Sequence, residues 1–398
     1  MDDINVIVCD DSALMRNLIS RIVDGTEGLH VVGTAMNGRF LLQKIPTLQP
    51  DLILLDIEMP EMTGIEFLQE RKAQGIDIPV VVLSSIAEKG APVTMQCLEL
   101  GASDFITKPN GSTSVNIATV SDLIIEKVAS YGRRYAVRKG KDIAPFEFYM
   151  HQAKEKEAEI DAKNKGLGDK VKPFEPSIKK TTTLSPTLFQ TKKKDPDVIE
   201  PLRQGANIDI VAIGISTGGP NALREVFAKI DPKFPKPILV VQHMPAGFTK
   251  EFAASLDRIC PLAVKEAEDG DLIHPGQIYI APGDYHIVVE KSTLCHVIRL
   301  SQAPLRNGHR PSADVLFESV AKEYTNHALG VIMTGMGKDG AAQLAEMRRQ
   351  GAWTLGQDEK SSIVYGMPKA GWENGAVQRQ VSLEDMADAI NKTVQEHS

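Results

Sequence analysis

A serine set among small residues is the first group of this chain that could act as a nucleophile. The apolar run of residues 207–215 ends at Ser216, and the pattern becomes helical near Pro220. This order predicts a buried strand, a tight turn and a helix, and Gly214-Ile-Ser-Thr-Gly218 fits the nucleophile-elbow pattern. The first N–H groups of such a helix point toward the group that the hydroxyl attacks, which favours acyl transfer. A phosphate-binding turn is the alternative, but Ser216 replaces its middle glycine.

A serine hydroxyl is a weak nucleophile at neutral pH, so it needs a base and a group that orients the base. His243 ends one further apolar run, and Asp339 follows another through a glycine-rich turn. Because chemistry gathers at the carboxyl ends of parallel strands, we expect Ser216, His243 and Asp339 to converge. His243 would take the serine proton, and Asp339 would hold the imidazole tautomer. His309, in Gly308-His-Arg-Pro311, is the alternative candidate for the base.

The order of these residues along the chain separates two kinds of hydrolase. In α/β-hydrolases the nucleophile is followed by the acid and then by the histidine. Here the histidine comes before the aspartate. An ordinary lipase-like hydrolase is therefore disfavoured.

The first third of the chain has a different set of strand-end residues. Apolar runs there end in paired acids, a single acid, a hydroxyl and a lysine. Carboxylates bind Mg²⁺, and a hydroxyl and an ammonium group can hold phosphoryl oxygens. We therefore predict phosphoryl transfer to Asp56, with Mg²⁺ held by Asp10, Asp11 and Asp56. Lys108 would neutralise the phosphoryl oxygens, and Ser84 would hydrogen-bond to them.

This constellation, in an alternating strand and helix order over about residues 3–125, resembles a response-regulator receiver domain. Phe105, three residues before Lys108, stands where such domains carry an aromatic switch residue. The resemblance implies a flavodoxin-like, doubly wound parallel sheet.

The second half carries five further motifs: Gly214-Ile-Ser-Thr-Gly-Gly-Pro220, Gln242-His-Met-Pro245, Ile280-Ala-Pro-Gly-Asp284, His309-Arg-Pro-Ser312 and Met333-Thr-Gly-Met-Gly-Lys-Asp-Gly340. A receiver joined to these motifs resembles the chemotaxis-type protein-glutamate methylesterases (protein-glutamine glutaminases). In that family the residues matching Ser216, His243 and Asp339 form a catalytic triad.

The resemblance implies hydrolysis of glutamate methyl esters, and deamidation of glutamines, on the helical cytoplasmic domain of chemoreceptors during chemotactic adaptation. Both reactions pass through a serine acyl-enzyme and need no cofactor at the esterase site. The N–H of Thr217 is one expected oxyanion donor, and the family suggests a second near Met336. A chemotaxis histidine kinase would be the phosphodonor, and the unphosphorylated receiver would cover the esterase site.

We thus expect two α/β domains with doubly wound parallel sheets: a receiver over residues 1–130 and a Rossmann-like methylesterase over residues 208–398. Between them, residues 131–207 lack long apolar runs and are rich in Lys, Glu, Pro, Ser and Thr. Such a composition predicts a flexible charged linker. The stretch 154–163, with opposite charges at helical spacing, could form a short helix.

The composition of the chain limits which partners and which cellular compartment we expect. The net charge of −7 gives no general attraction to nucleic acid or to anionic membranes. No apolar run is long enough to span a bilayer, and the amino terminus lacks a secretory pattern. Four scattered cysteines suit a reducing cytoplasm. We expect a cytoplasmic protein without membrane insertion.

Two other functions remain open. A phosphorylation-controlled binding module would keep the receiver but use the turn at Ser216 to hold a ligand. A hydrolase or amidase for a small metabolite would share the triad but not the receptor substrate.

Overall fold

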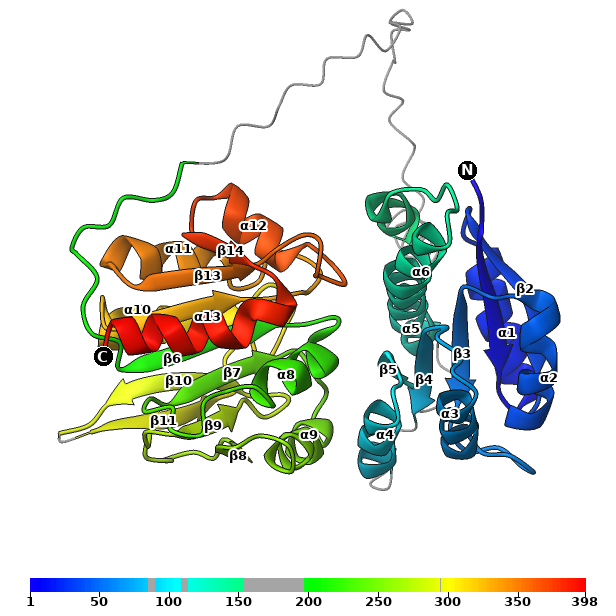
Figure 1. Ribbon diagram of the computed structural model, residues 1–398, viewed down its shortest axis with the longest axis horizontal. Coiled ribbons are helices and arrows are strands. Elements are labelled where there is room, and N and C mark those ends of the chain that lie inside the picture. Colours follow the sequence, from blue (N-terminus) through cyan, green and yellow to red (C-terminus); the bar gives the residue numbers. More distant parts are fainter. Residues whose placement is uncertain (85–89, 109–113, 154–196, 294) are drawn as a thin grey trace, which may run out of the picture.

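The structure, a computed structural model, describes residues 1–84, 90–108, 114–153, 197–293 and 295–398, with the side chains of residues 114–119 left aside. Two α/β domains lie next to each other (Figure 1). Among the described residues, no helix is long and apolar enough to cross a membrane.

The first domain is built on a five-stranded sheet with the order β2-β1-β3-β4-β5. All four strand pairs are parallel, and this order is flavodoxin-like. The strands are β1 (Ile4–Cys9), β2 (Leu29–Ala35), β3 (Leu52–Asp56), β4 (Val80–Ser84) and β5 (Asp104–Thr107). Every residue of β3 and β4 is buried, because helices cover both faces of a parallel sheet.

The helices of this domain alternate with its strands: α1 (Ala13–Asp24), α2 (Gly38–Leu48), α3 (Gly64–Ala73), α4 (Gly90–Glu99) and α5 (Ser114–Lys127). After α5 the chain stays helical through η1 (Val128–Gly132) and α6 (Arg133–Arg138). The predicted receiver fold is confirmed by this topology.

The prediction of a flexible linker over residues 131–207 is wrong at both ends of this range. Tyr131, Tyr135, Ala136 and Tyr149 are buried against the receiver core. At the other end, Ala206 accepts a hydrogen bond from the indole of Trp353 in the second domain. The polar composition of the segment gave no sign of these contacts. A few buried aromatic side chains are enough to hold a segment that has no apolar periodicity. Residues 154–196, including the helix expected over 154–163, lie outside the described residues.

The second domain is built on a seven-stranded sheet with the order β14-β13-β12-β6-β7-β9-β8. All of its strand pairs are parallel. The strands are β6 (Ile210–Ile215), β7 (Ile238–Gln242), β8 (Ala263–Glu266), β9 (Gln277–Ile280), β12 (Ala328–Ile332), β13 (Trp353–Gln357) and β14 (Arg379–Val381). The strand order reverses between β6 and β12, and ligands of such sheets bind at the crevice formed there.

The described helices of this domain are α8 (Gly219–Phe227), α9 (Phe248–Asp257), α10 (Ala313–Tyr324), α11 (Ala341–Gln350), α12 (Met367–Glu373) and α13 (Leu383–Glu396). An antiparallel hairpin, β10 (His286–Lys291) and β11 (His296–Ser301), adds to the predicted parallel architecture.

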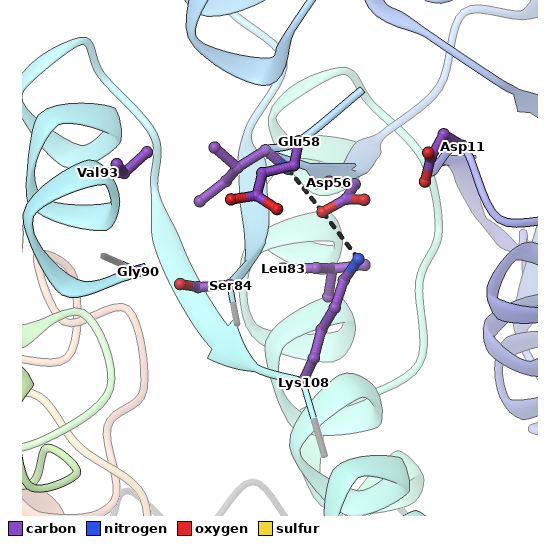
Figure 2. Close-up of a pocket in the computed structure, with 9 residues that line it drawn as sticks. Asp11, Asp56, Glu58, Leu83, Ser84, Gly90, Val93 and Lys108 are labelled. Carbon is purple, nitrogen blue, oxygen red and sulfur yellow. Dashed lines mark hydrogen bonds and ion pairs between the residues drawn. The ribbon is translucent and has the colours of Figure 1, made fainter. Parts of the chain in front are cut away.

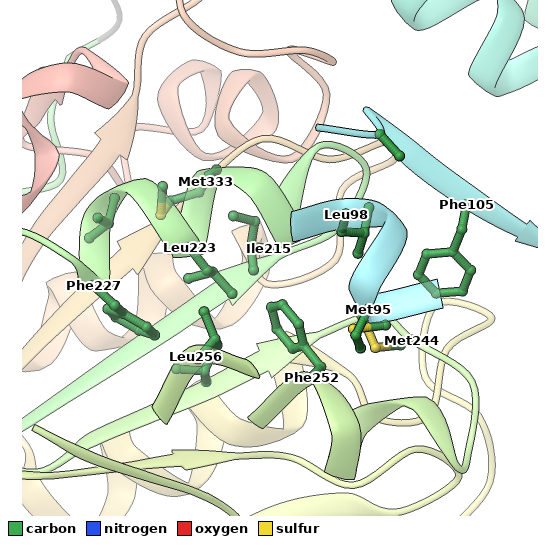
Figure 3. Packing of buried hydrophobic residues seen from close by; sticks show 14 of the residues in the cluster. Met95, Leu98, Phe105, Ile215, Leu223, Phe227, Met244, Phe252, Leu256 and Met333 are labelled. Carbon is green, nitrogen blue, oxygen red and sulfur yellow. The ribbon is translucent and has the colours of Figure 1, made fainter. Parts of the chain in front are cut away.

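The two domains share a hydrophobic cluster (Figure 3). The ring of Phe105 on β5 stacks on that of Phe248 at the start of α9, with 5.0 Å between centroids. Nearby, the Asn221 amide donates to the carbonyls of Ala102 and Ser103, both at 3.0 Å. The expected switch aromatic therefore belongs to the contact between the domains.

Candidate active site

Ser216, His243 and Asp339 lie together at the carboxyl edge of the seven-stranded sheet. Ser216 follows β6, His243 follows β7, and Asp339 lies between β12 and α11. Nδ1 of His243 is 3.1 Å from Oγ of Ser216, and its Nε2 is 2.8 Å from Oδ2 of Asp339. The side chains of His243 and Asp339 are only 8% and 1% exposed. The structure thus brings together the three residues that we expected to converge.

The turn after Ser216 needs a glycine at position 218 for two reasons. Gly218 has φ = 84°, a left-handed conformation that side chains disfavour. A Cβ atom there would also lie 2.7 Å from Cγ1 of Ile363. With Pro220 in the first turn of α8, this local geometry fixes the start of the helix beside the serine hydroxyl.

The carboxylate of Asp339 is surrounded by donors. The Asn307 amide donates to it at 2.8 Å, the Ser312 hydroxyl at 2.7 Å and the Ala313 N–H at 2.6 Å. Burial raises the pKa of Asp339, but the hydrogen bond and charge of His243 and the hydrogen bonds from Asn307 and Ser312 lower it by more, so the net pKa lies well below the ordinary value. Asp339 is therefore ionised near neutral pH.

An ionised Asp339 determines the tautomer of His243. Its Nε2 must carry the proton that is donated to the carboxylate, so Nδ1 presents a lone pair to the serine hydroxyl. In the serine-protease arrangement the two ring nitrogens have the opposite partners. The proton transfer is the same, because either nitrogen of a neutral imidazole can act as the base.

His309, which we considered as an alternative base, forms no hydrogen bond with Ser216 in the described part of the chain. Its ring stacks on that of His243, with centroids 3.9 Å apart and an interplanar angle of 15°. Burial, followed by the charge of His243, lowers the pKa of His309 to about 4. A neutral ring is therefore packed against the base at neutral pH.

The two expected oxyanion residues lie beside Ser216. Thr217 follows the serine at the start of α8, and its hydroxyl donates to Glu126 of the receiver. The Lys127 ammonium also donates to that hydroxyl at 3.2 Å. Met336 follows Gly335, where an added Cβ atom would lie 2.7 Å from Cβ of Ser216. Both backbone segments thus lie next to the nucleophile, and their role in holding an oxyanion stays a prediction.

The first domain has a second cluster of polar groups, in a cavity of about 300 Å³ (Figure 2). Lys108 lies at the cavity, with its ammonium 2.8 Å from Oδ1 of Asp56 and 2.9 Å from Oδ2 of Asp10. Ser84 also lines this cavity, and its Oγ is 2.6 Å from the hydroxyl oxygen of Thr94. The predicted phosphoryl-transfer residues are therefore neighbours in space.

Burial raises the pKa of Asp56, and the charge of Asp10 raises it further, while Lys108 lowers it; the net pKa is raised. One oxygen each of Asp10, Asp11 and Asp56 lies within 4.8 Å of the others. Three carboxylate oxygens at this spacing fit a hard cation such as Mg²⁺, and a cation there would favour the ionised form of Asp56.

Sequence reasoning missed several residues around both sites. Glu58 lines the receiver cavity, and Asn307 bridges Asp339 to Asp314 through its amide. Glu126 and Lys127 reach Thr217 from the other domain. Of these residues, only Glu58 could have been suggested by the sequence, because it is an acid two residues after Asp56. The others depend on how distant segments pack.

Comparison with known proteins agrees with this architecture. Residues 6–118 match the response regulator receiver domain family, and residues 211–390 match the CheB methylesterase family. A protein-glutamate methylesterase/protein-glutamine glutaminase of Treponema denticola is 56% identical over 392 residues, covering 98% of each chain. The protein of the same name from Treponema pallidum is 50% identical, covering 98% of this chain and 97% of its own.

Among solved structures, the Thermotoga maritima CheB methylesterase catalytic domain is 37% identical, covering 48% of this chain and all of its own, with a TM-score of 0.46. The two family matches, together with the fold and the clustered polar groups, define a response regulator with a hydrolytic output domain. The chain belongs to the protein-glutamate methylesterase/protein-glutamine glutaminase family. It is therefore a carboxylic ester hydrolase whose receiver controls it.

Proposed function

We propose that this enzyme hydrolyses glutamate methyl esters, and deamidates glutamines, on the cytoplasmic helical domain of chemoreceptors, and so takes part in chemotactic adaptation. The observation that carries the proposal is the hydrogen-bonded series from Ser216 through His243 to Asp339. Membership of the family supports the substrate class. Since the receptor domain is cytoplasmic, we place the reaction in the cytoplasm.

In the first half-reaction, Oγ of Ser216 attacks the side-chain carbonyl carbon while Nδ1 of His243 takes its proton. The tetrahedral intermediate then collapses, and the same proton goes to the leaving oxygen, releasing methanol. Asp339 stabilises the imidazolium cation between these two transfers. From a glutamine the leaving group is ammonia, and the acyl-enzyme is identical.

In the second half-reaction, His243 activates water, which attacks the acyl-enzyme and releases a glutamate carboxylate and free Ser216. The backbone N–H groups of Thr217 and Met336 would hold the oxyanion in both halves. Loss of one oxyanion donor typically costs about a hundredfold to a thousandfold in rate. No cofactor takes part in this hydrolysis.

We further propose that Asp56 accepts a phosphoryl group from a chemotaxis histidine kinase. An oxygen of its carboxylate attacks phosphorus, and the bond from phosphorus to the kinase histidine breaks. Asp10, Asp11 and Asp56 would hold Mg²⁺, which supplies charge neutralisation when bound. Lys108 and Ser84 would then contact the phosphoryl oxygens.

Phosphorylation would control the esterase through the contact between the domains. Buried charged groups meet there: Lys127 lies 2.9 Å from Oδ2 of Asp104 and also contacts Thr217. Burial lowers the pKa of Lys127, but the charges of Asp104 and Glu126 raise it more, so the ammonium stays charged. Because Thr217 is an oxyanion residue, a receiver that shifts its α5 end acts directly on the site.

The test is methanol release from methylated receptor and from a small glutamate methyl ester by the full chain. We expect activity on receptor, stimulation by acetyl phosphate, loss of that stimulation in Asp56→Asn, and loss of all activity in Ser216→Ala. Retained activity in Ser216→Ala would contradict the catalytic assignment. A preference for small esters over receptor would instead indicate a metabolite hydrolase.

A further inference from the structure

The glutamine that precedes the catalytic histidine is buried beside the nucleophile. Gln242 is the last residue of β7 and is only 2% exposed. Its amide nitrogen, Nε2, donates to the main-chain carbonyl of Ser216 and to that of His243, both at 3.1 Å. One buried amide group therefore joins the two backbone segments that carry the nucleophile and the base.

The other end of the Gln242 amide explains its orientation. Its oxygen, Oε1, is buried and has no hydrogen-bond partner in the part of the chain that the structure describes. A Cβ atom added at Gly219, the first residue of α8, would collide with this oxygen, so Oε1 faces the positive end of the helix dipole. The reversed amide would place an oxygen against two carbonyl oxygens. An unpaired buried acceptor is unfavourable, so packing alone does not account for a glutamine at this position.

The pairing of β6 with β7 ends just before the two catalytic residues. Ile215 is paired with Gln242, and the N–H of His243 donates to the carbonyl of Ile215 at 3.2 Å. Beyond this pair the two chains separate, one toward α8 and the other toward α9. The bonds of the Gln242 amide continue the connection past the end of the strand pair. Among the described residues, no other donor bonds to the His243 carbonyl.

The ring nitrogen that faces the serine makes this backbone connection important. Oγ of Ser216 lies 3.1 Å from Nδ1 of His243, and Nδ1 is the ring nitrogen nearer to the main chain. The distance between nucleophile and base therefore depends closely on the separation of the two backbones. Asp339 binds the opposite nitrogen, Nε2, and so does not fix this separation. A displacement of about 1 Å between reacting groups can cost about a hundredfold in rate.

We propose that Gln242 is a positioning residue for the hydrolysis: its amide holds the carbonyls of Ser216 and His243 and thereby sets the approach of Nδ1 to Oγ. All the groups involved belong to the esterase domain, so Gln242 acts in the same way whether the receiver is packed on the site or separated from it. This inference rests on the proposed function, because it takes Ser216 as the nucleophile and His243 as the base.

The test compares Gln242→Met with Gln378→Met in the full chain. Methionine keeps the length of the side chain but removes the donor. The amide of Gln378 also bonds to the backbone of the sheet, through the N–H of Thr354 on β13 at 2.8 Å, but away from the catalytic residues. We expect Gln242→Met to lower kcat about tenfold to a hundredfold on methylated receptor and on a small glutamate methyl ester. KM and the stimulation by acetyl phosphate should stay within about twofold of the wild type.

The control variant, Gln378→Met, should keep kcat within about twofold of the wild type. Equal losses in the two variants, or a kcat within about twofold of the wild type in Gln242→Met, would overturn the proposal. A changed stimulation by acetyl phosphate in Gln242→Met would also overturn it, because the residue would then act through the contact between the domains.

Two further measurements separate positioning from a general loss of structure. Phosphonylation of Ser216 by a fluorophosphonate needs the serine and its base but no receptor, and in Gln242→Met it should slow by the same factor as kcat. The low-field proton resonance of the bond between His243 and Asp339 should persist, because Gln242 does not bond to Asp339. Loss of this resonance would show that the whole series collapses and would contradict a positioning role. The proposed function fails separately, if Ser216→Ala keeps esterase activity.

Discussion

Asn307 shows how much the active site depends on residues outside the Ser216–His243–Asp339 series. Its amide donates to Asp339 at 2.8 Å and to Asp314 at 2.6 Å, so one side chain separates two buried carboxylates. Its φ of 54° is left-handed, which makes glycine the least strained replacement. Hydrogen bonds to charged groups contribute about 1.5–3 kcal/mol.

We therefore expect Asn307→Gly to lower kcat on methylated receptor about tenfold to a hundredfold with little change in KM. Asn307→Asp should cost more, because it places a third carboxylate beside Asp339 and Asp314. Initial rates of methanol release over a range of receptor concentrations measure both constants. A kcat within twofold of the wild type for Asn307→Gly would show that Asn307 does not position Asp339.

His309 predicts a pH dependence of stability. Its pKa is about 4 in the folded protein against an ordinary 6.5, so the unfolded chain binds more protons between these values. Its contribution to stability is complete above about pH 6.5 and is lost as the pH falls toward 4. Between pH 7 and pH 5 this amounts to about 2 kcal/mol.

The free energy of unfolding of the esterase domain should therefore fall by about 2 kcal/mol less in His309→Gln than in the wild type between pH 7 and pH 5. Fluorescence isolates this domain, because both tryptophans, Trp353 and Trp372, belong to it. Urea titrations at the two pH values give the difference. Equal pH dependence in both proteins would contradict a partly buried His309 that stays neutral at neutral pH.

The helical extension after α5 is part of the receiver core. Tyr149 is fully buried and lies against Gly28, where an added Cβ atom would be 3.1 Å from its ring. Its hydroxyl is buried without a hydrogen-bond partner among the described residues. The ring therefore stabilises the domain, and the hydroxyl does not.

Tyr149→Ala should lower the free energy of unfolding of the receiver by about 3 kcal/mol, as for other large-to-small core changes. Tyr149→Phe, the matched control, should stay within about 1 kcal/mol of the wild type. Urea unfolding followed by far-UV circular dichroism reports both domains, and tryptophan fluorescence identifies the esterase transition. If Tyr149→Ala left the receiver transition in place, the extension would not be structural.

The sequence predicted an element well where the interactions that form it join residues close together in the chain. Buried runs such as β3 and β6 carry their own signal, and parallel strands ending at one edge were enough to group Ser216, His243 and Asp339. The extension around Tyr149 was missed because its anchors are isolated aromatics in a polar stretch. Asn307 and Glu126 could not be predicted, since their roles depend on contacts between segments that lie far apart in the chain.

An ion pair at the edge of the contact between the two domains allows a test of whether the receiver controls the esterase. Glu99 of α4 pairs with Arg258, which follows α9, at 2.5 Å. Reversing one partner turns this attraction into repulsion. A bias of about 1 kcal/mol between packed and separated domains would change the separated population about fivefold.

Arg258→Glu and Glu99→Arg should therefore each raise methanol release without phosphodonor severalfold, and the double reversal should return it toward the wild-type rate. Neither residue belongs to the esterase site, so the effect reports domain packing. If the single variants released methanol at the wild-type rate, the ion pair between Glu99 and Arg258 would have no part in regulation.

The proposed mechanism requires Ser216 and His243 to act as one unit. The most direct measurement is the rate of methanol release from methylated receptor by Ser216→Ala, His243→Ala and the double variant. Residues that act together are strongly non-additive. We expect each single variant to lose at least about a ten-thousandfold in kcat and the double variant to be no slower than either. Single losses below about tenfold, or losses that multiply in the double variant, would contradict it.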